Sequence, residues 1–307
     1  MKILRPQYEI WVQAPGLSGI YKQIERAGRV CYKSENNTTA DSAKPFVDRM
    51  IQSEHFAMLE HGTVYLTCKH GELPLYLTNK FSRVNTVDGK DYITTNLRVL
   101  AENHSMGDLS YLSDYEEGKH ELRITVHFTT QIAITREYNR HRANSMAEQS
   151  TRYCNYTKNK FGSEISINLP TWIEEKTKEY SDSETLNTLI DGTGTPEETE
   201  SDRFRDLCED IANSETEDWT PLDAWLFANQ AAEFAYMKLI NAGCKPQEAR
   251  VILPLDCNTE LVHTAFINDW IHFFDLRALG TTGAPHPDAK VLAAPLMEEF
   301  RAKGYIK

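Results

Sequence analysis

The sequence predicts an α+β protein, organised as a single domain spanning residues 1–307. Two stretches, 63–69 and 122–128, alternate β-branched or aromatic residues with other types, which predicts strands. In 17–34, apolar residues recur at three- and four-residue intervals, the pattern of an amphipathic helix. A chain of 307 residues with 40% hydrophobic residues can bury a substantial core, as one large domain or two modest ones. Because neither an internal repeat nor a clear linker is evident, one elaborated domain is favoured.

Helices and strands are expected to alternate through the first half of the chain. A second helix is expected at 43–53, where several apolar side chains share one face. The strand at 122–128 is expected to lead into a helical segment at 129–139. Between the two strands, 79–119 contains Asp-Gly and Met-Gly-Asp turn signals and is interpreted as a surface insertion. A strand or short helix is expected in its middle, at 92–100.

A second surface insertion is expected at 174–218, which is rich in Glu, Asp, Ser and Thr. Thr220 is then followed by a proline and, three residues on, an acidic residue, so a helix should begin there. Gly243 is expected to mark its end. A short helix should follow from Pro246, and a last long helix is expected at 259–277.

Composition limits the classes of function. With a formal charge of −12, most of the surface should repel a nucleic-acid backbone. No apolar stretch approaches the roughly 20 residues needed to span a bilayer, and the first residues lack the apolar core of a signal peptide. The 6 cysteines are scattered without a C-x-x-C pair, which indicates reduced thiols in a cytoplasmic protein. His55 and His61 lack the spacing of a helical metal pair, so no metal site is expected.

Positive charge is concentrated at 140–153, where three arginines and a histidine lie among hydroxyl side chains. Guanidinium groups match phosphate oxygens with planar forks of donors, so this segment predicts a nucleotide site. There is a simpler alternative: Arg140, Asn144, Glu148 and Arg152 recur every four residues and could form one solvated helical face with Arg–Glu pairing.

The order of residues in this segment carries a resemblance. The segment is similar to the signature of the flavin-dependent thymidylate synthases. It reads Arg-His-Arg, two residues, Ser, four residues, Ser, one residue and Arg-Tyr. The resemblance extends from about residue 20 to 290 and includes segments at 26–32, 55–61, 249–255 and 270–277. It implies a mixed or antiparallel sheet flanked by long helices. It also implies reductive methylation of dUMP to dTMP by a homotetramer with shared active sites, using FAD, NADPH and 5,10-methylenetetrahydrofolate.

The resemblance assigns roles to individual residues. Arg277 would be catalytic, holding negative charge on the uracil ring, and His55 would lie on the folate side. The residues expected to bind dUMP are Glu137, Arg140, Glu148, Gln149, Ser150, Thr151, Arg152, Arg250 and Arg277. The residues expected to bind FAD are Ala57, Arg140, His141, Arg142, Glu148, Phe266 and His272. Four of the assigned positions differ from the residues that are common in the family: Glu137, Ala57, Thr151 and Phe266. A contact of His286 with folate is left open.

Three rival interpretations remain. The first is a relative that binds nucleotide without turnover, which the intact Arg152, Arg250 and Arg277 argue against. The second is a nucleic-acid-binding module that uses 140–152 as a basic patch, which the acidic remainder disfavours. The third is a Rossmann oxidoreductase, which would need a G-x-G-x-x-G after a strand, and the sequence has none.

Overall fold

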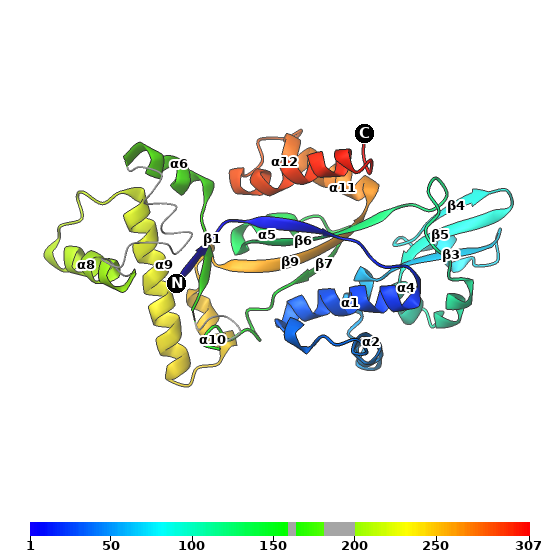
Figure 1. Cartoon of the computed structure of the whole chain (residues 1–307), viewed down its shortest axis with the longest axis horizontal. Helices are drawn as coiled ribbons and strands as arrows, with labels where there is room; N and C mark the ends of the chain where they lie inside the picture. Colours follow the sequence, from blue (N-terminus) through cyan, green and yellow to red (C-terminus); the bar gives the residue numbers. More distant parts are fainter. Residues whose placement is uncertain (159–163, 181–199) are drawn as a thin grey trace. The chain divides into compact units, whose positions relative to one another are not determined.

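The computed structural model describes residues 1–158, 164–180 and 200–307, which form two compact units (Figure 1). The described residues of Met1–Gln7, Thr129–Glu137 and Ser150–Thr259 form the first unit. The second unit comprises Tyr8–Phe128, Tyr138–Gln149 and Glu260–Lys307. Helices and strands occur in both units, so the predicted α+β class is confirmed.

Most residues of a four-stranded sheet belong to the second unit. Its order is β2 (Gln7–Trp11), β6 (Arg123–Gln131), β9 (Asn258–Phe266) and β7 (Ser145–Glu148). β7 pairs antiparallel with β9, with Met146 opposite His263. Figure 1 shows α11 (Ile267–Phe274) and α12 (Pro287–Ala302) on one side of this sheet and α1 (Gly16–Tyr32) on the other. The predicted strand at 122–128 and the predicted helix at 17–34 are therefore confirmed.

A smaller antiparallel sheet of the second unit has the order β3 (Thr63–Lys69), β5 (Lys90–Asn96) and β4 (Arg83–Val87). The segment 79–119, interpreted above as a surface insertion, instead contains two of these strands and α4 (Leu97–Glu102). Ile93 and Leu97 are buried in a core cluster with Ile24 and Leu66. Short helices complete this region: η1 (Glu35–Asn37), α2 (Ala43–Gln52), η2 (Phe56–His61), α3 (Leu75–Thr78) and η3 (Met106–Tyr111).

The first unit is mainly helical. It contains the parallel pair β1 (Lys2–Leu4) and β8 (Ser166–Asn168), together with α6 (Thr171–Tyr180), α8 (Glu200–Asn213), α9 (Pro221–Asn241), α10 (Pro246–Ala249) and η5 (Arg250–Ile252). The expected start of α9 is confirmed, because Thr220 and Asp223 form a reciprocal capping box. Within the second expected insertion, 174–218, residues 181–199 lie outside the described residues.

The expected long helix at 259–277 is wrong in its first half. β9 continues to Phe266, and only then does α11 begin, followed by the π-helical turn Asp275–Leu279. The last six residues of β9 are all buried, so the strand shows no alternation of apolar and polar residues. A strand buried on both faces cannot be distinguished from a buried helix by periodicity. Among the described helices, none is long and apolar enough to cross a membrane.

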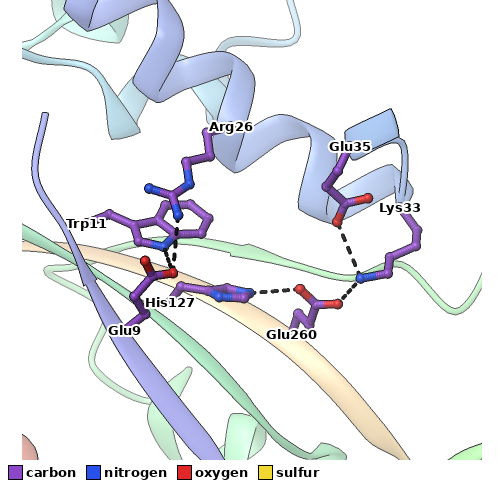
Figure 2. Close-up of polar contacts among 7 residues, drawn as sticks. All are labelled: Glu9, Trp11, Arg26, Lys33, Glu35, His127 and Glu260. Atoms are coloured by element: carbon purple, nitrogen blue, oxygen red, sulfur yellow. Dashed lines mark hydrogen bonds and ion pairs between the residues drawn. The ribbon is translucent and has the colours of Figure 1, made fainter. Parts of the chain in front are cut away.

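A network of charged and aromatic side chains joins the end of α1 to the four-stranded sheet (Figure 2). Glu260 on β9 accepts a hydrogen bond from His127 Nε2 at 2.8 Å and forms an ion pair with Lys33. Lys33 is the left-handed residue that ends α1 (φ 47°). On β2, Trp11 stacks on His127 with ring centroids 4.7 Å apart, and the Arg26 guanidinium lies 3.7 Å from the centroid of the Trp11 ring. Trp11 is buried, and the His127 and Glu260 side chains are only 16% and 12% exposed, so loss of their contacts should reduce stability.

We expect Glu260→Gln to lower the free energy of unfolding by about 1–2 kcal/mol at neutral pH, because hydrogen bonds to a buried charge are lost. Burial opposes ionisation of Glu260, but the hydrogen bond from His127 and the Lys33 ammonium hold its pKa below the usual value. Stability from a lowered carboxyl pKa is present above the unfolded-state pKa and is lost as the pH falls through the folded-state pKa. The difference in Tm between wild type and variant should therefore shrink in acid.

The matched control is Asp48→Asn, which breaks an exposed ion pair with Lys44. Exposed pairs contribute little, so this variant should melt close to wild type across the same pH range. Equal melting temperatures of wild type and Glu260→Gln at neutral pH would show that the network does not stabilise the fold.

Candidate active site

The turn at 140–144 connects α5 (Ile132–Tyr138) to β7. Tyr138 anchors its start, because this fully buried side chain donates from its hydroxyl to the Ala289 carbonyl at 2.8 Å. Within the turn, the Asn144 backbone N–H donates to the His141 carbonyl at 3.1 Å. β7 then begins at Ser145. The alternative of a helical face running from Arg140 to Arg152 is therefore wrong.

A pocket of about 290 Å³ lies against this turn. Its lining comes from the turn and from the α11 region: Arg140, His141, Arg142, Ala143, Asn144, Asp269, His272, Leu276 and Arg277. All of these residues belong to the second unit. The sequence placed five of them in the site, and the structure brings those five together: Arg140, His141, Arg142, His272 and Arg277.

Arg277 and His141 are in direct contact in this pocket. Arg277 Nε donates to His141 Nε2 at 3.2 Å. A guanidinium nitrogen can only donate, so His141 Nε2 is the acceptor, and the imidazole in this arrangement is neutral with its proton on Nδ1. His272 lies edge-on to the same ring, with centroids 5.7 Å apart. Arg277 lies in the π-helical turn after α11, a feature frequently found at functional sites.

The pocket has an excess of positive charge. Arg140 and Arg142 are exposed, and neither forms an ion pair with another described residue. Asp269 is the acidic residue of the lining. Two guanidinium groups without carboxylate partners, in a protein of net charge −12, suit a bound anion.

A second group of predicted residues lies in the first unit. Arg250, at the start of η5, donates from its guanidinium to Thr151 Oγ1 at 3.2 Å. Ser150 begins a tight turn, and its carbonyl accepts from the amides of Tyr153 and Cys154. Arg152 is exposed, with its guanidinium 5.5 Å from the centroid of the Tyr153 ring. This group combines two arginines with two hydroxyl side chains, which suits a phosphate.

Residues 120–303 match the family model described as thymidylate synthase complementing protein. The match covers more than half of the 307 residues and includes both arginine groups. The chain belongs to this family, the flavin-dependent thymidylate synthases. It is therefore an enzyme of the thymidylate synthase type, a methyltransferase.

Solved structures of a UMP/dUMP methylase PolB from Streptomyces cacaoi are similar to this chain. The structure bound with 5-Br dUMP is 15% identical and has a TM-score of 0.40, with 99% of this chain and 93% of that chain covered. The structure bound with 5-Br UMP is 16% identical and has a TM-score of 0.40, with 99% and 92% covered. No curated protein sequence matches the chain at a significant level.

Three other residues that the resemblance assigned to the flavin and folate do not line this pocket. His55 and Ala57 are exposed at the start of η2. Phe266 is buried, and its ring is approached by the guanidinium groups of Arg83 and Arg123 at 4.7 and 5.3 Å. Their contacts with ligands stay predictions.

The remaining predicted residues, Glu137, Glu148 and Gln149, lie close to the turn in sequence. Glu137 is half-buried near the end of α5. Glu148 is half-buried and accepts a hydrogen bond from Asn139 Nδ2 at 2.9 Å. Gln149 is buried, and its backbone N–H donates to the Glu260 carbonyl at 2.8 Å. Their roles in binding dUMP stay predictions as well.

The other four residues of the pocket lining were not assigned to the site from the sequence: Ala143, Asn144, Asp269 and Leu276. The sequence also did not identify Arg123, a buried side chain that donates to Ser145 Oγ at 3.3 Å and to the Glu60 carbonyl at 3.2 Å. Arg123 thereby holds the first serine of the signature. Because it acts through tertiary contacts between residues far apart in the chain, no local pattern could reveal it.

Proposed function

We propose that the protein converts dUMP to dTMP by FAD-dependent reductive methylation, with 5,10-methylenetetrahydrofolate as the carbon donor and NADPH as the reductant. The observation that supports this most directly is the contact of Arg277 with His141 in a pocket that also holds Arg140 and Arg142. The Arg277 guanidinium suits a uracil ring that must accept negative charge during the reaction. The guanidinium groups of Arg140 and Arg142 suit the phosphates of a cofactor bound beside it.

The pocket residues fit the chemistry of FAD. Arg140 and Arg142 present guanidinium groups for the phosphates, and His141 and His272 present imidazole rings for the flavin ring. FAD, when bound, supplies reducing equivalents taken from NADPH and relays the one-carbon unit. The role of the protein is then to hold the flavin ring and the uracil ring next to each other in the orientation that reacts. Such positioning contributes much of the rate acceleration in these reactions.

In this proposal, the two arginine groups that bind one nucleotide come from different subunits. Ser150, Thr151, Arg152 and Arg250 bind the dUMP phosphate through charge-assisted hydrogen bonds. Arg277 binds the carbonyl and N3 edge of the uracil ring, where it stabilises the negative charge that makes C5 nucleophilic. The hydrogen bond to His141 restricts the guanidinium to one orientation, so little reorganisation is needed during the reaction.

The cysteines are poor candidates for a nucleophile that would attack the pyrimidine. None of the 6 lines the pocket. Burial raises the pKa of the Cys257 thiol to about 12 and also raises the pKa values of Cys31 and Cys68. A thiol with a raised pKa is mostly protonated and unreactive at neutral pH. This supports a mechanism without a covalent enzyme–nucleotide bond.

The proposed function is tested by the flavin content of the purified protein. Wild type should carry FAD whose visible absorbance is bleached by NADPH, and Arg142→Ala should weaken FAD binding by roughly 10–100-fold through loss of a charge-assisted contact. Arg49→Ala, which changes an exposed arginine of α2, should bind FAD like wild type. A wild-type protein that neither contains nor binds FAD would refute the proposal.

We further propose a homotetramer with active sites shared between subunits. Arg250 and residues 148–152 of one subunit bind a nucleotide that lies against residues 140–142 of another subunit. Mixed oligomers of Arg140→Ala and Arg152→Ala chains should then show more activity than either variant alone, because some sites receive both intact arginines. Activity assays after co-expression, with the oligomeric state measured by light scattering, test this prediction. A fully active monomer would contradict it.

A further inference from the structure

The turn at 140–144 is held at its end by a residue that does not line the pocket. The Asn144 side-chain amide forms a hydrogen bond with Nε2 of His263, at the centre of β9. Asn144 lines the pocket, whereas His263 is fully buried behind it. In the signature, Asn144 occupies one of the two unspecified positions between the Arg-His-Arg triplet and the serine, so the signature itself assigns it no role.

His263 is fixed by its surroundings. Its ring packs on Trp270 with centroids 4.4 Å apart and lies edge-on to Phe273 at 5.5 Å. Trp270 is itself held, because its indole Nε1 donates to the Ile124 carbonyl at 3.1 Å. A ring confined in this way provides a rigid partner for the amide of Asn144.

Burial sets the charge of the His263 ring, and the hydrogen bond sets its tautomer. Burial and the nearby His141 and His61 hold the pKa of His263 well below its usual value, so the ring is neutral. Asn144 Nδ2 donates, so Nε2 accepts and the proton lies on Nδ1. His263 Nδ1 has no hydrogen-bond partner among the described residues. Among the described residues, the Asn144 side chain therefore provides the hydrogen bond that holds this ring. Substitution of either residue breaks this hydrogen bond and should alter the position of the other side chain.

We propose that Asn144 and His263 are a positioning pair, which fixes the 140–144 turn so that His141 meets Arg277 and Arg142 faces the bound flavin. This inference rests on the proposed function, because FAD is the ligand that the turn would position. Tyr138 holds the start of the turn through Ala289, and the Asn144–His263 contact holds its end. With both ends fixed, the backbone that carries the intervening arginines and histidine loses little conformational freedom on binding, which favours affinity.

The experiment is a double-mutant cycle on the holoenzyme. Asn144→Ala removes the amide, and His263→Phe removes the acceptor while keeping a ring that packs on Trp270. The FAD dissociation constant is measured from the fluorescence of flavin released on dilution. Each single variant should bind FAD about 3- to 10-fold more weakly, the range for one hydrogen bond. The double variant should be no weaker than the weaker single variant, because both changes break the same contact.

Two further variants separate positioning from stability. His263→Gln restores a polar partner and should recover part of the affinity. Asn241→Ala, an exposed residue at the end of α9, should leave FAD binding unchanged. Asn144→Ala should weaken FAD binding by the folded protein, whereas a merely structural role would lower Tm without changing the affinity of the folded protein. If His263→Phe does not fold, Asn144→Ala and His263→Gln still decide the question.

Additive losses in the double variant, or an Asn144→Ala protein that retains FAD as tightly as wild type, would overturn the positioning role. A wild-type protein without FAD would instead refute the proposed function, and the positioning role with it. The two failures are thus distinguished by the wild-type measurement.

Discussion

Arg277→Ala should reduce dTMP formation by ~10²–10³-fold, as expected for the loss of one preorganised donor that stabilises developing charge. Uracil C5 becomes nucleophilic only when negative charge spreads from N3 onto the ring carbonyls. A guanidinium is permanently charged, so it can stabilise this charge without a proton transfer of its own. Oxidation of NADPH by the bound flavin should remain nearly intact, because that half-reaction does not involve the uracil ring. Rapid-mixing assays of flavin reduction and of dTMP yield measure the two steps separately.

The competing explanation is that Arg277 only stabilises the end of a helix, since basic residues in the last turn favour the helix dipole. It predicts a lower Tm with unchanged turnover per folded enzyme. Arg301→Ala is a suitable control, because Arg301 is an exposed arginine in the last turn of α12. Near-normal dTMP formation by Arg277→Ala would end the catalytic assignment.

Arg152→Lys should weaken dUMP binding by ~1–3 kcal/mol, the range for charge-assisted hydrogen bonds, although the charge is kept. Lysine lacks the planar fork that matches phosphate oxygens, so the loss reports on geometry rather than on charge. FAD content should be nearly unchanged, because Arg152 is assigned to the nucleotide. Equilibrium dialysis with dUMP, together with the flavin absorbance of the same sample, measures both effects.

Deoxyuridine, which lacks the phosphate, provides the control for Arg152. It should bind wild type far more weakly than dUMP, and it should not distinguish wild type from Arg152→Lys. Equal binding of deoxyuridine and dUMP to wild type would show that 150–152 does not recognise phosphate.

Elements with strong local signals were predicted well from the sequence. β3 has the expected bounds of 63–69, and α2 (Ala43–Gln52) lies within one residue of the expected 43–53. The capping box at Thr220 located the start of α9. In each case the determining interactions lie within a few residues of one another, so the pattern is visible without the fold.

Elements determined by tertiary burial were missed. β9 was expected to be helical because both of its faces are buried, and residues 140–152 showed a four-residue periodicity without forming a helix. The candidate site shows the same division. The signature located Arg140, His141 and Arg142, whereas the contact between Asn144 and His263 joins residues more than a hundred positions apart. No local spacing encodes such a contact.

The product formed from the folate tests the central proposal most directly. Reduction of the transferred carbon to a methyl group needs two electrons, which come either from NADPH or from the folate ring. Wild type supplied with dUMP, 5,10-methylenetetrahydrofolate and NADPH should form dTMP with an equal amount of NADPH oxidised, and the folate should be recovered as tetrahydrofolate. Chromatography of the folate products measures this directly. Formation of dTMP with dihydrofolate and without NADPH consumption would contradict the flavin-dependent mechanism.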